Sequence, residues 1–184
     1  MKKFELTSET KINFFGKKLF RIKALISFGD VKAGETGGWV EKEGNVNQFG
    51  NAWVSGDAMV FGNAMVSGNA RVSGNARVSD NAWVSGNAGV SGDARVSGNA
   101  MVSGDARVSG DADYTTIRGF GTQFRTTTFF RCKDKKVRVA CGCFFGTIPE
   151  FREQVKKTRS GKIVEEYLMI ADLMEKHFEV KSNE

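Results

Sequence analysis

The sequence predicts a mainly β protein whose central part is a solenoid of short strands. Valine recurs at every sixth position from Val54 to Val108, and alanine does the same from Ala52 to Ala112. Each of these alanines follows Asn or Asp. A fixed short period of this kind is typical of solenoids. The chain also has 22 glycines but one proline, which favours regular structure with many tight turns over disorder.

Each six-residue repeat offers a strand and a corner. The strand is Ala-x-Val-Ser, in which alanine and valine are two residues apart and so share one face. The corner is Gly-Asn or Gly-Asp, residue types that readily adopt the positive φ of a sharp turn. Asp80 replaces glycine at one corner, and Asp tolerates this conformation better than most residues.

The repeat between Val54 and Asp113 resembles that of the hexapeptide-repeat family, whose fold is a left-handed parallel β-helix with three hexads per coil. The resemblance implies that residues 18 apart stack on neighbouring coils, with valine and alanine filling the interior. It also implies ladders of stacked side chains at the three corners, since amide side chains bond well at the strand spacing of roughly 4.8 Å. The corner sets are Asn51, Asn69, Asn87 and Asp105; Asp57, Asn75, Asp93 and Asp111; and Asn63, Asn81 and Asn99.

One outward stripe of the predicted coil is apolar. It consists of Met65, Trp83 and Met101, whereas another face carries Trp53 among arginines. A monomer rarely leaves a contiguous apolar patch in water. Proteins of the hexapeptide-repeat family are commonly trimers packed side by side, so the resemblance implies that this stripe is a homotrimer interface. The alternative is that the flanking segments fold back over it.

The N-terminal flank, residues 1–39, is predicted to be a β cap, because an open solenoid end exposes unpaired strand edges. The alternating residues on either side of Gly16 indicate a hairpin. A degenerate first coil follows in the predicted β-helix of residues 40–113, with Val46 in an alanine position.

The C-terminal flank, residues 114–184, is predicted to hold a small β-hairpin and two helices. The hairpin has strands at 127–132 and 137–144, with Val137, Val139, Cys141 and Cys143 on one face. Thr147, Pro149 and Glu150 form a helix-start signal. That helix should end near Thr158. A second one should span about 162–179, with an apolar stripe of Ile163, Tyr167, Ile170, Met174 and Phe178.

The flanks together with the repeat resemble a group of hexapeptide-repeat proteins found in bacteriophages and prophages. The similarity rests on Leu19 to Leu25, Gly37 to Val40, Phe130 to Cys132, Cys141 to Phe144 and Glu166 to Leu168. It implies a viral accessory protein in a bacterial cytoplasm, of a kind that often blocks a host factor or sequesters a signal molecule. Three cysteines, an odd number, also fit a reducing compartment. We expect no membrane span and no signal peptide.

Basic charge gathers in the C-terminal flank, where residues 114–162 carry twelve basic and three acidic residues. Phenylalanines at 120, 124, 129 and 130 interleave with it, a pattern suited to nucleic acid or a nucleotide. The alternative is a solvated surface over a small phenylalanine core. The candidate binding residues are Arg118, Arg125, Arg131, Lys133, Lys135, Lys136, Arg138, Lys156, Lys157 and Arg159, with Arg152 in the same run.

Catalysis is not predicted. Many hexapeptide-repeat proteins are acyltransferases with a histidine base, but the single histidine here, His177, falls outside the repeat. Cys132, Cys141, Cys143 and His177 could in principle form a zinc site, yet the spacing lacks paired C-x-x-C motifs and buried thiols are the simpler expectation. We therefore predict no catalytic residue, no cofactor and no metal.

The resulting hypothesis is a non-enzymatic, trimeric binding scaffold of phage type. Its basic cap would contact a host defence protein, a nucleotide or a nucleic acid, as a counter-defence inhibitor or a sequestering protein. The alternatives are a structural or assembly protein of a phage particle and, less favoured, an acyltransferase.

Overall fold

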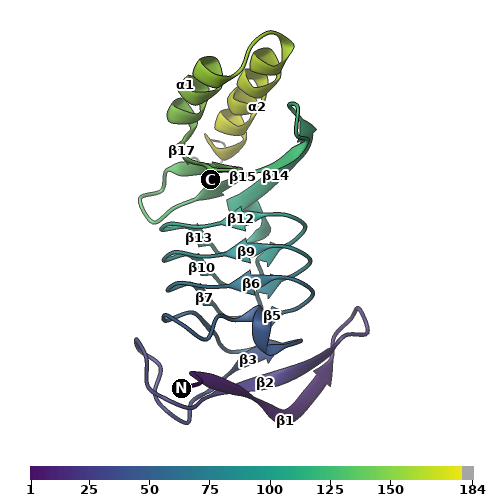
Figure 1. Ribbon diagram of the computed structural model, residues 1–184, viewed down its shortest axis with the longest axis vertical. Coiled ribbons are helices and arrows are strands. Elements are labelled where there is room, and N and C mark those ends of the chain that lie inside the picture. The colour runs from purple at the N-terminus through teal and green to yellow at the C-terminus, as the bar shows by residue number, and fades with distance from the viewer. Residues whose placement is uncertain (180–184) are drawn as a thin grey trace.

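The protein is an elongated β-solenoid closed at each end by a cap (Figure 1). The structure, a computed structural model, describes residues 1–179. The N-terminal cap contains β1 (Phe4–Ile12), β2 (Lys18–Ala24) and β3 (Thr36–Val40). The C-terminal cap contains β14 (Tyr114–Phe120), β15 (Arg125–Arg131), β16 (Val137–Cys141), β17 (Phe144–Thr147), α1 (Ile148–Thr158) and α2 (Lys162–Glu179).

The solenoid has three faces of stacked parallel strands. Neighbouring strands pair residues 18 apart, as Trp53 does with Arg71 and Val54 with Val72. The regular strand covers two residues of each repeat, shorter than the four expected. One face stacks β4 (Trp53–Val54), β7 (Arg71–Val72), β10 (Gly89–Val90) and β13 (Arg107–Val108). The second stacks β5 (Met59–Val60), β8 (Arg77–Val78) and β11 (Arg95–Val96), and the third β6 (Met65–Val66), β9 (Trp83–Val84) and β12 (Met101–Val102).

The interior is filled by the repeating valines and alanines. Every valine from Val54 to Val108 and every alanine from Ala52 to Ala106 at the repeat positions is at most 1% exposed. Burying one valine side chain stabilises the fold by about 1.5–3 kcal/mol. The coils are joined by backbone bonds such as that from the N–H of Trp53 to the carbonyl of Ala70, 3.0 Å. The predicted β-helix fold class, with its caps, is confirmed.

The corners carry the expected side-chain ladders, with one exception. Asn51, Asn69, Asn87 and Asp105 form a continuous chain of hydrogen bonds of 3.0–3.1 Å. Asn63, Asn81 and Asn99 form a second chain at 3.1–3.3 Å. The third corner has a single bond, from Asn75 to Asp93, among the described residues. At its end Asp111 instead accepts the backbone N–H of Arg95 at 2.9 Å, in the 3-10 turn Asp111–Asp113.

The N-terminal cap continues directly into the solenoid. The predicted hairpin is confirmed: β1 and β2 pair antiparallel around Gly16, whose φ is 75°. Strand β3 then pairs antiparallel with β2 and parallel with β5. The cap also covers Trp53, which was expected on the outside but is 2% exposed because Phe4 and Phe28 pack on its indole ring.

The first coil differs from the repeat in length. Val46 was expected in an alanine position, but it pairs with Val66, twenty residues further on. The extra length lies around the 3-10 turn Glu43–Asn45. There the buried Asn45 amide donates to the carbonyl oxygens of Ala64, at 2.8 Å, and Gly62, at 3.2 Å. The expectation failed because a buried polar side chain replaces part of the regular pairing.

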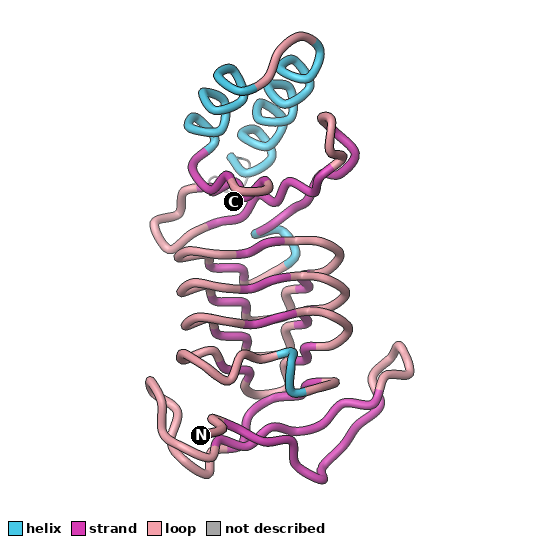
Figure 2. Tube along the Cα trace, in the orientation of Figure 1, coloured by secondary structure: helices cyan, strands magenta, loops and turns pink. Residues whose placement is uncertain are grey.

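The C-terminal cap is a four-stranded antiparallel sheet between the solenoid and the two helices (Figure 2). Phe130 and Ala140 face the solenoid core, whereas Phe129 and Val139 face the helices. Strands β14 and β17 were not predicted from the sequence. It also placed Cys143 on a strand face, but Gly142, at φ 60°, turns the chain and leaves Cys143 exposed.

The two helices form as predicted. At the start of α1, the Thr147 hydroxyl accepts the N–H of Glu150 at 3.3 Å, and the Glu150 carboxylate accepts the N–H of Thr147 at 2.7 Å. The apolar stripe of α2 packs against α1 and shares one core with Phe129 of β15. Among residues 1–179, no helix is long and apolar enough to cross a membrane.

Candidate functional site

The basic residues of the C-terminal cap do not form one surface. Arg131, Arg138 and Arg152 are mainly structural. The Arg131 guanidinium donates to the carbonyl oxygen of Phe178, lies 5.3 Å from the centre of that ring, and is 3.7 Å from the Asp113 carboxylate. Arg138 pairs with Asp134 at 2.8 Å, and Arg152 pairs with Asp172 and Glu175 at 2.6 Å each.

The remaining predicted binding residues fall at opposite ends of β15. Lys133, Lys135 and Lys136 occupy the turn between β15 and β16. Arg118 and Arg125 lie toward the other end, where Arg125 and Arg159 line one small cavity. Seven residues of strand span about 20 Å, too far for one small ligand. Lys157 is exposed near the end of α1, and Lys156 there pairs with Glu153 at 3.1 Å.

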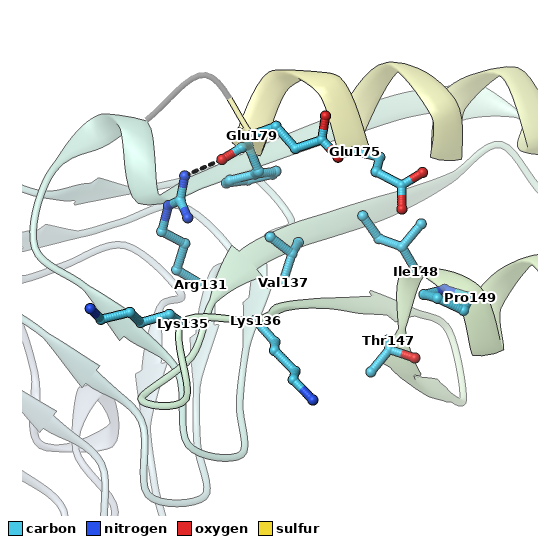
Figure 3. Close-up of a pocket in the computed structure, with 10 residues that line it drawn as sticks. Arg131, Lys135, Lys136, Val137, Thr147, Ile148, Pro149, Glu175 and Glu179 are labelled. Carbon is cyan, nitrogen blue, oxygen red and sulfur yellow. Dashed lines mark hydrogen bonds between the residues drawn. The ribbon is translucent and has the colours of Figure 1, made fainter. Parts of the chain in front are cut away.

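A ligand-sized pocket of about 510 Å³ lies in the cap between the β15–β16 turn and α2, and we call it the cap pocket (Figure 3). Its walls are the apolar side chains of Val137, Ile148, Pro149 and Phe178. The charged and polar groups around it are Arg131, Lys135, Lys136, Thr147, Glu175 and Glu179. Ligand pockets commonly have volumes of roughly 300–1,000 Å³ and a mostly apolar lining.

The ammonium groups of Lys135 and Lys136 lie at the mouth of the cap pocket. Figure 3 shows Lys135 and Lys136 leaving the turn with their ammonium groups directed outward, opposite the helix that carries Glu175 and Glu179. Within residues 1–179, neither lysine has an acidic group within 4.0 Å. Glu175 is neutralised by Arg152 at 2.6 Å. The pocket therefore offers two unpaired cations against one exposed carboxylate, Glu179.

The turn that carries these lysines is held in place by Asp134. Its carboxylate accepts the N–H of Lys136 at 3.0 Å and the guanidinium of Arg138 at 2.8 Å. The backbone bond from Lys136, followed by Arg138, lowers the pKa of Asp134. Lys135 has a left-handed φ of 63°, a conformation that costs energy for a residue other than glycine. The lysines thus project from a defined turn.

Two of the four phenylalanines in the basic segment belong to the core. Phe129 and Phe130 are fully buried on opposite faces of β15. Phe120 and Phe124 are 38% and 67% exposed near the tip of the β14–β15 hairpin, away from the β15–β16 turn. The interleaved aromatics are therefore not one stacking surface.

The apolar stripe exists as a stack on the third face of the solenoid. Met65 pairs in register with Trp83, and Trp83 with Met101. Met65 and Trp83 are 42% and 46% exposed, and the Trp83 indole N–H is fixed by a 2.9 Å bond to the Ser67 hydroxyl. At the other end the cap approaches: the N–H of Met101 donates to the Thr128 hydroxyl at 3.0 Å. The flank covers only the Met101 end.

The zinc candidates do not come together. Cys132 lies against the solenoid core, where burial raises its thiol pKa to about 11, while Cys141 faces the helices and Cys143 is exposed. His177 is exposed on the last turn of α2, with its ring 5.1 Å from that of Phe178. Over the described residues, no three His, Cys, Asp or Glu side chains are arranged to hold a metal ion.

Comparison with known proteins identifies the repeat. A family model described as "YdcK Beta solenoid repeat" matches residues 60–74, 64–80, 70–86, 76–92 and 94–110. All five matches lie within the solenoid and none reaches either cap. The chain therefore carries a β-solenoid repeat, as the hexapeptide pattern predicted. No curated protein matches the chain.

Sequence reasoning found the lysines of the cap pocket but not its walls. Phe178 was recognised only as a helix residue, and Val137 only as part of a strand face. Their positions around one pocket depend on how α2 packs across the sheet, which no local pattern encodes. The only available signal was the cluster of Lys135 and Lys136 in a predicted turn.

Proposed function

We propose that this protein is a non-enzymatic, trimeric binding scaffold of phage type that works in the bacterial cytoplasm, and that its cap pocket sequesters a nucleotide. The observation that supports the proposal most is the cap pocket itself, which has apolar walls and is lined by Lys135 and Lys136, two lysines without an ion pair among residues 1–179. A counter-defence role follows from the phage resemblance, since a sequestered nucleotide signal would no longer reach its host receptor.

The chemistry of the pocket suits the two halves of a nucleotide. The apolar walls provided by Val137, Ile148 and Phe178 can contact a base or ribose. Lysine ammonium groups are well suited to phosphate, which they bind as point charges. Glu179 on the opposite wall would disfavour a fully anionic ligand that fills the whole pocket. The phosphates would therefore lie at the lysine side.

The solenoid is proposed to act as the assembly platform. Trp83 and Met65 present an exposed apolar stripe, and the Ser67 bond holds the indole ring in one orientation. Large exposed apolar residues that stack along a rigid face are typical of protein interfaces. A cyclic trimer would place three cap pockets around one axis.

A titration tests the ligand. ADP and adenosine should be titrated calorimetrically at low salt, because phosphate contacts weaken as salt rises. We expect ADP to bind and adenosine to bind at least tenfold more weakly. The variant Lys135→Glu/Lys136→Glu should lose ADP binding. The matched control Lys157→Glu reverses an exposed charge near the end of α1 and should keep it.

Loss of ADP binding can be distinguished from loss of folding. If ADP does not bind the wild-type protein, or binds the double variant unchanged, the cap pocket is not a nucleotide site. Circular dichroism and thermal melting of the double variant establish that the cap is still folded. Both lysines are exposed, so the substitution should leave the melting temperature nearly unchanged.

A further inference from the structure

A second, smaller cavity lies at the opposite end of β15 from the Lys135–Lys136 turn. Its volume is about 190 Å³, and it is formed where the start of β15, the β16–β17 turn, the end of α1 and the middle of α2 meet. We call it the arginine pocket, because Arg125 and Arg159 line it. Of the described residues that line it, none is acidic.

Arg125 is positioned by the backbone of the β16–β17 turn. Its guanidinium packs on Gly142, so closely that a Cβ atom at that position would lie 2.4 Å from Nη1 of Arg125. Gly142 also has a φ of 60°. Glycine therefore suits the turn conformation and leaves room for the arginine to lie against the backbone.

Arg159 is held by main-chain carbonyl groups. It is the residue that ends α1, its N–H donates to the Val155 carbonyl, and its guanidinium donates to the Thr158 carbonyl at 3.1 Å. In the part of the chain that the structure describes, neither arginine has an acidic group within 4.0 Å. On α2 beside Tyr167, Glu166 is 3.6 Å from Lys162 instead.

The floor of the arginine pocket is rigid and aromatic. The buried rings of Phe151 and Tyr167 meet edge to face at 5.7 Å. The Tyr167 hydroxyl donates to the Phe120 carbonyl at 3.3 Å, which ties the pocket to the β14–β15 hairpin. Burial raises the pKa of Tyr167, so the hydroxyl stays neutral at physiological pH and adds no negative charge.

We propose that the arginine pocket binds a phosphate group. Guanidinium groups present paired N–H donors that match phosphate oxygens bidentately. Arg125 and Arg159, neither of which has an acidic group within 4.0 Å among the described residues, keep most of those donors available. The cavity has room for a phosphate group but falls below the roughly 300 Å³ of a typical ligand pocket. The group is either free inorganic phosphate or the terminal phosphate of a larger ligand that extends into solvent.

The C-terminal end of α1 carries a partial negative charge that lowers the affinity of the arginine pocket for phosphate. Carbonyl groups at a helix C-terminus carry a partial negative charge that is screened by nearby cations. Lys156 and Lys157 lie in the last turn of α1 and offset it together with Arg159. Replacing Arg159 would therefore remove a hydrogen-bond donor to the phosphate. It would also leave the partial negative charge at the end of α1 less screened.

Calorimetric titration with inorganic phosphate and with phenyl phosphate tests the site. Both probes should bind the wild-type protein, and each of Arg125→Gln and Arg159→Gln should weaken binding at least tenfold. The control Lys176→Gln removes an exposed charge in the last turn of α2 that does not line the pocket and should leave binding within twofold. If phenyl phosphate binds more tightly than inorganic phosphate, the ligand is the terminal phosphate of a larger molecule. If the two bind equally, the ligand is the free ion.

A second readout places the ligand in the cavity. Cys143 lines the arginine pocket and is exposed, whereas Cys132 is buried elsewhere. Phosphate should slow alkylation of Cys143 by iodoacetamide, measured by peptide mass spectrometry, and Arg125→Gln should abolish that protection. The proposal is overturned if neither probe binds, or if binding and protection survive in both arginine variants. The Lys135→Glu/Lys136→Glu variant should bind phosphate normally, so this result is independent of the cap pocket.

Discussion

The ammonium group of Lys3 donates a 2.8 Å hydrogen bond to the carbonyl oxygen of Ala52, the first alanine of the repeat. It also lies 3.3 Å from the carbonyl oxygen of Gly50 and 4.8 Å from the centre of the Phe28 ring. The first coil has no preceding coil to bond these carbonyls. A buried lysine therefore closes the end of the solenoid and satisfies acceptors that would otherwise be orphaned.

Lys3 gives the stability of the protein a dependence on pH. Burial, reinforced by Arg71, lowers the pKa of Lys3 from 10.5 to about 8. Between these values the unfolded chain binds a proton that the folded protein has lost, so the free energy of unfolding should rise as pH increases from 8 to 10.5. The difference in stability between wild type and Lys3→Met should change by on the order of 1–3 kcal/mol over this range.

Urea denaturation at pH 7.5 and 10.5 measures this change. Lys2→Met is the matched control, because Lys2 is exposed and pairs with Glu43 at the surface. The comparison with Lys3→Met is needed because the raised thiol pKa of Cys132 lowers the stability of both proteins as the pH rises above 9. A wild-type minus Lys3→Met difference that stays constant with pH would show that Lys3 titrates normally.

Asp80 tests the corner geometry. It is the one corner residue among the described coils where glycine is replaced, at a φ of 60°, and its carboxylate accepts the Gly98 N–H at 2.9 Å. Asp80→Ala should cost about 1–3 kcal/mol, because alanine is strained at positive φ and leaves that N–H without its partner. Asp80→Asn should be nearly neutral, since asparagine tolerates the conformation and retains an acceptor oxygen. Equal losses in both variants, measured by urea denaturation, would contradict this account.

Trp83 tests the proposed trimer. Sedimentation velocity should find wild-type particles of about three times the 20.1 kDa chain mass. Trp83→Arg should dissociate them, because it places a charge at the centre of the apolar stripe. Arg95→Glu alters another face and should leave the assembly intact. Wild-type protein that sediments as a monomer would rule out the trimer.

The solenoid could be predicted closely because its pattern is local. Any six residues specify a strand face and a corner, so Val66 and Val84 could be assigned to the interior without knowledge of the rest. The helices could be predicted for the same reason, because the bonds between Thr147 and Glu150 that cap α1 join residues only three apart in the sequence. Errors began where one element depends on a distant one. Asn45 reaches across to Ala64 and lengthens the first coil, and Phe4 covers Trp53.

The candidate site was predicted only in part for the same physical reason. Charge along the chain indicated a basic cap, but it could not separate Arg131, which is bound to Phe178, from Lys135, which has no acidic group within 4.0 Å in residues 1–179. Nor could it show that Arg159, at the end of α1, lies beside Arg125 at the start of β15. Those distinctions depend on the packing of the two helices against the sheet.

A crystal structure of the protein soaked with ADP tests the central claim most directly. The account predicts density for one nucleotide in the cap pocket, with the base against Val137 and Phe178 and the phosphates beside Lys135 and Lys136. An empty cap pocket at saturating ADP, or a nucleotide bound only elsewhere on the molecule, would contradict it.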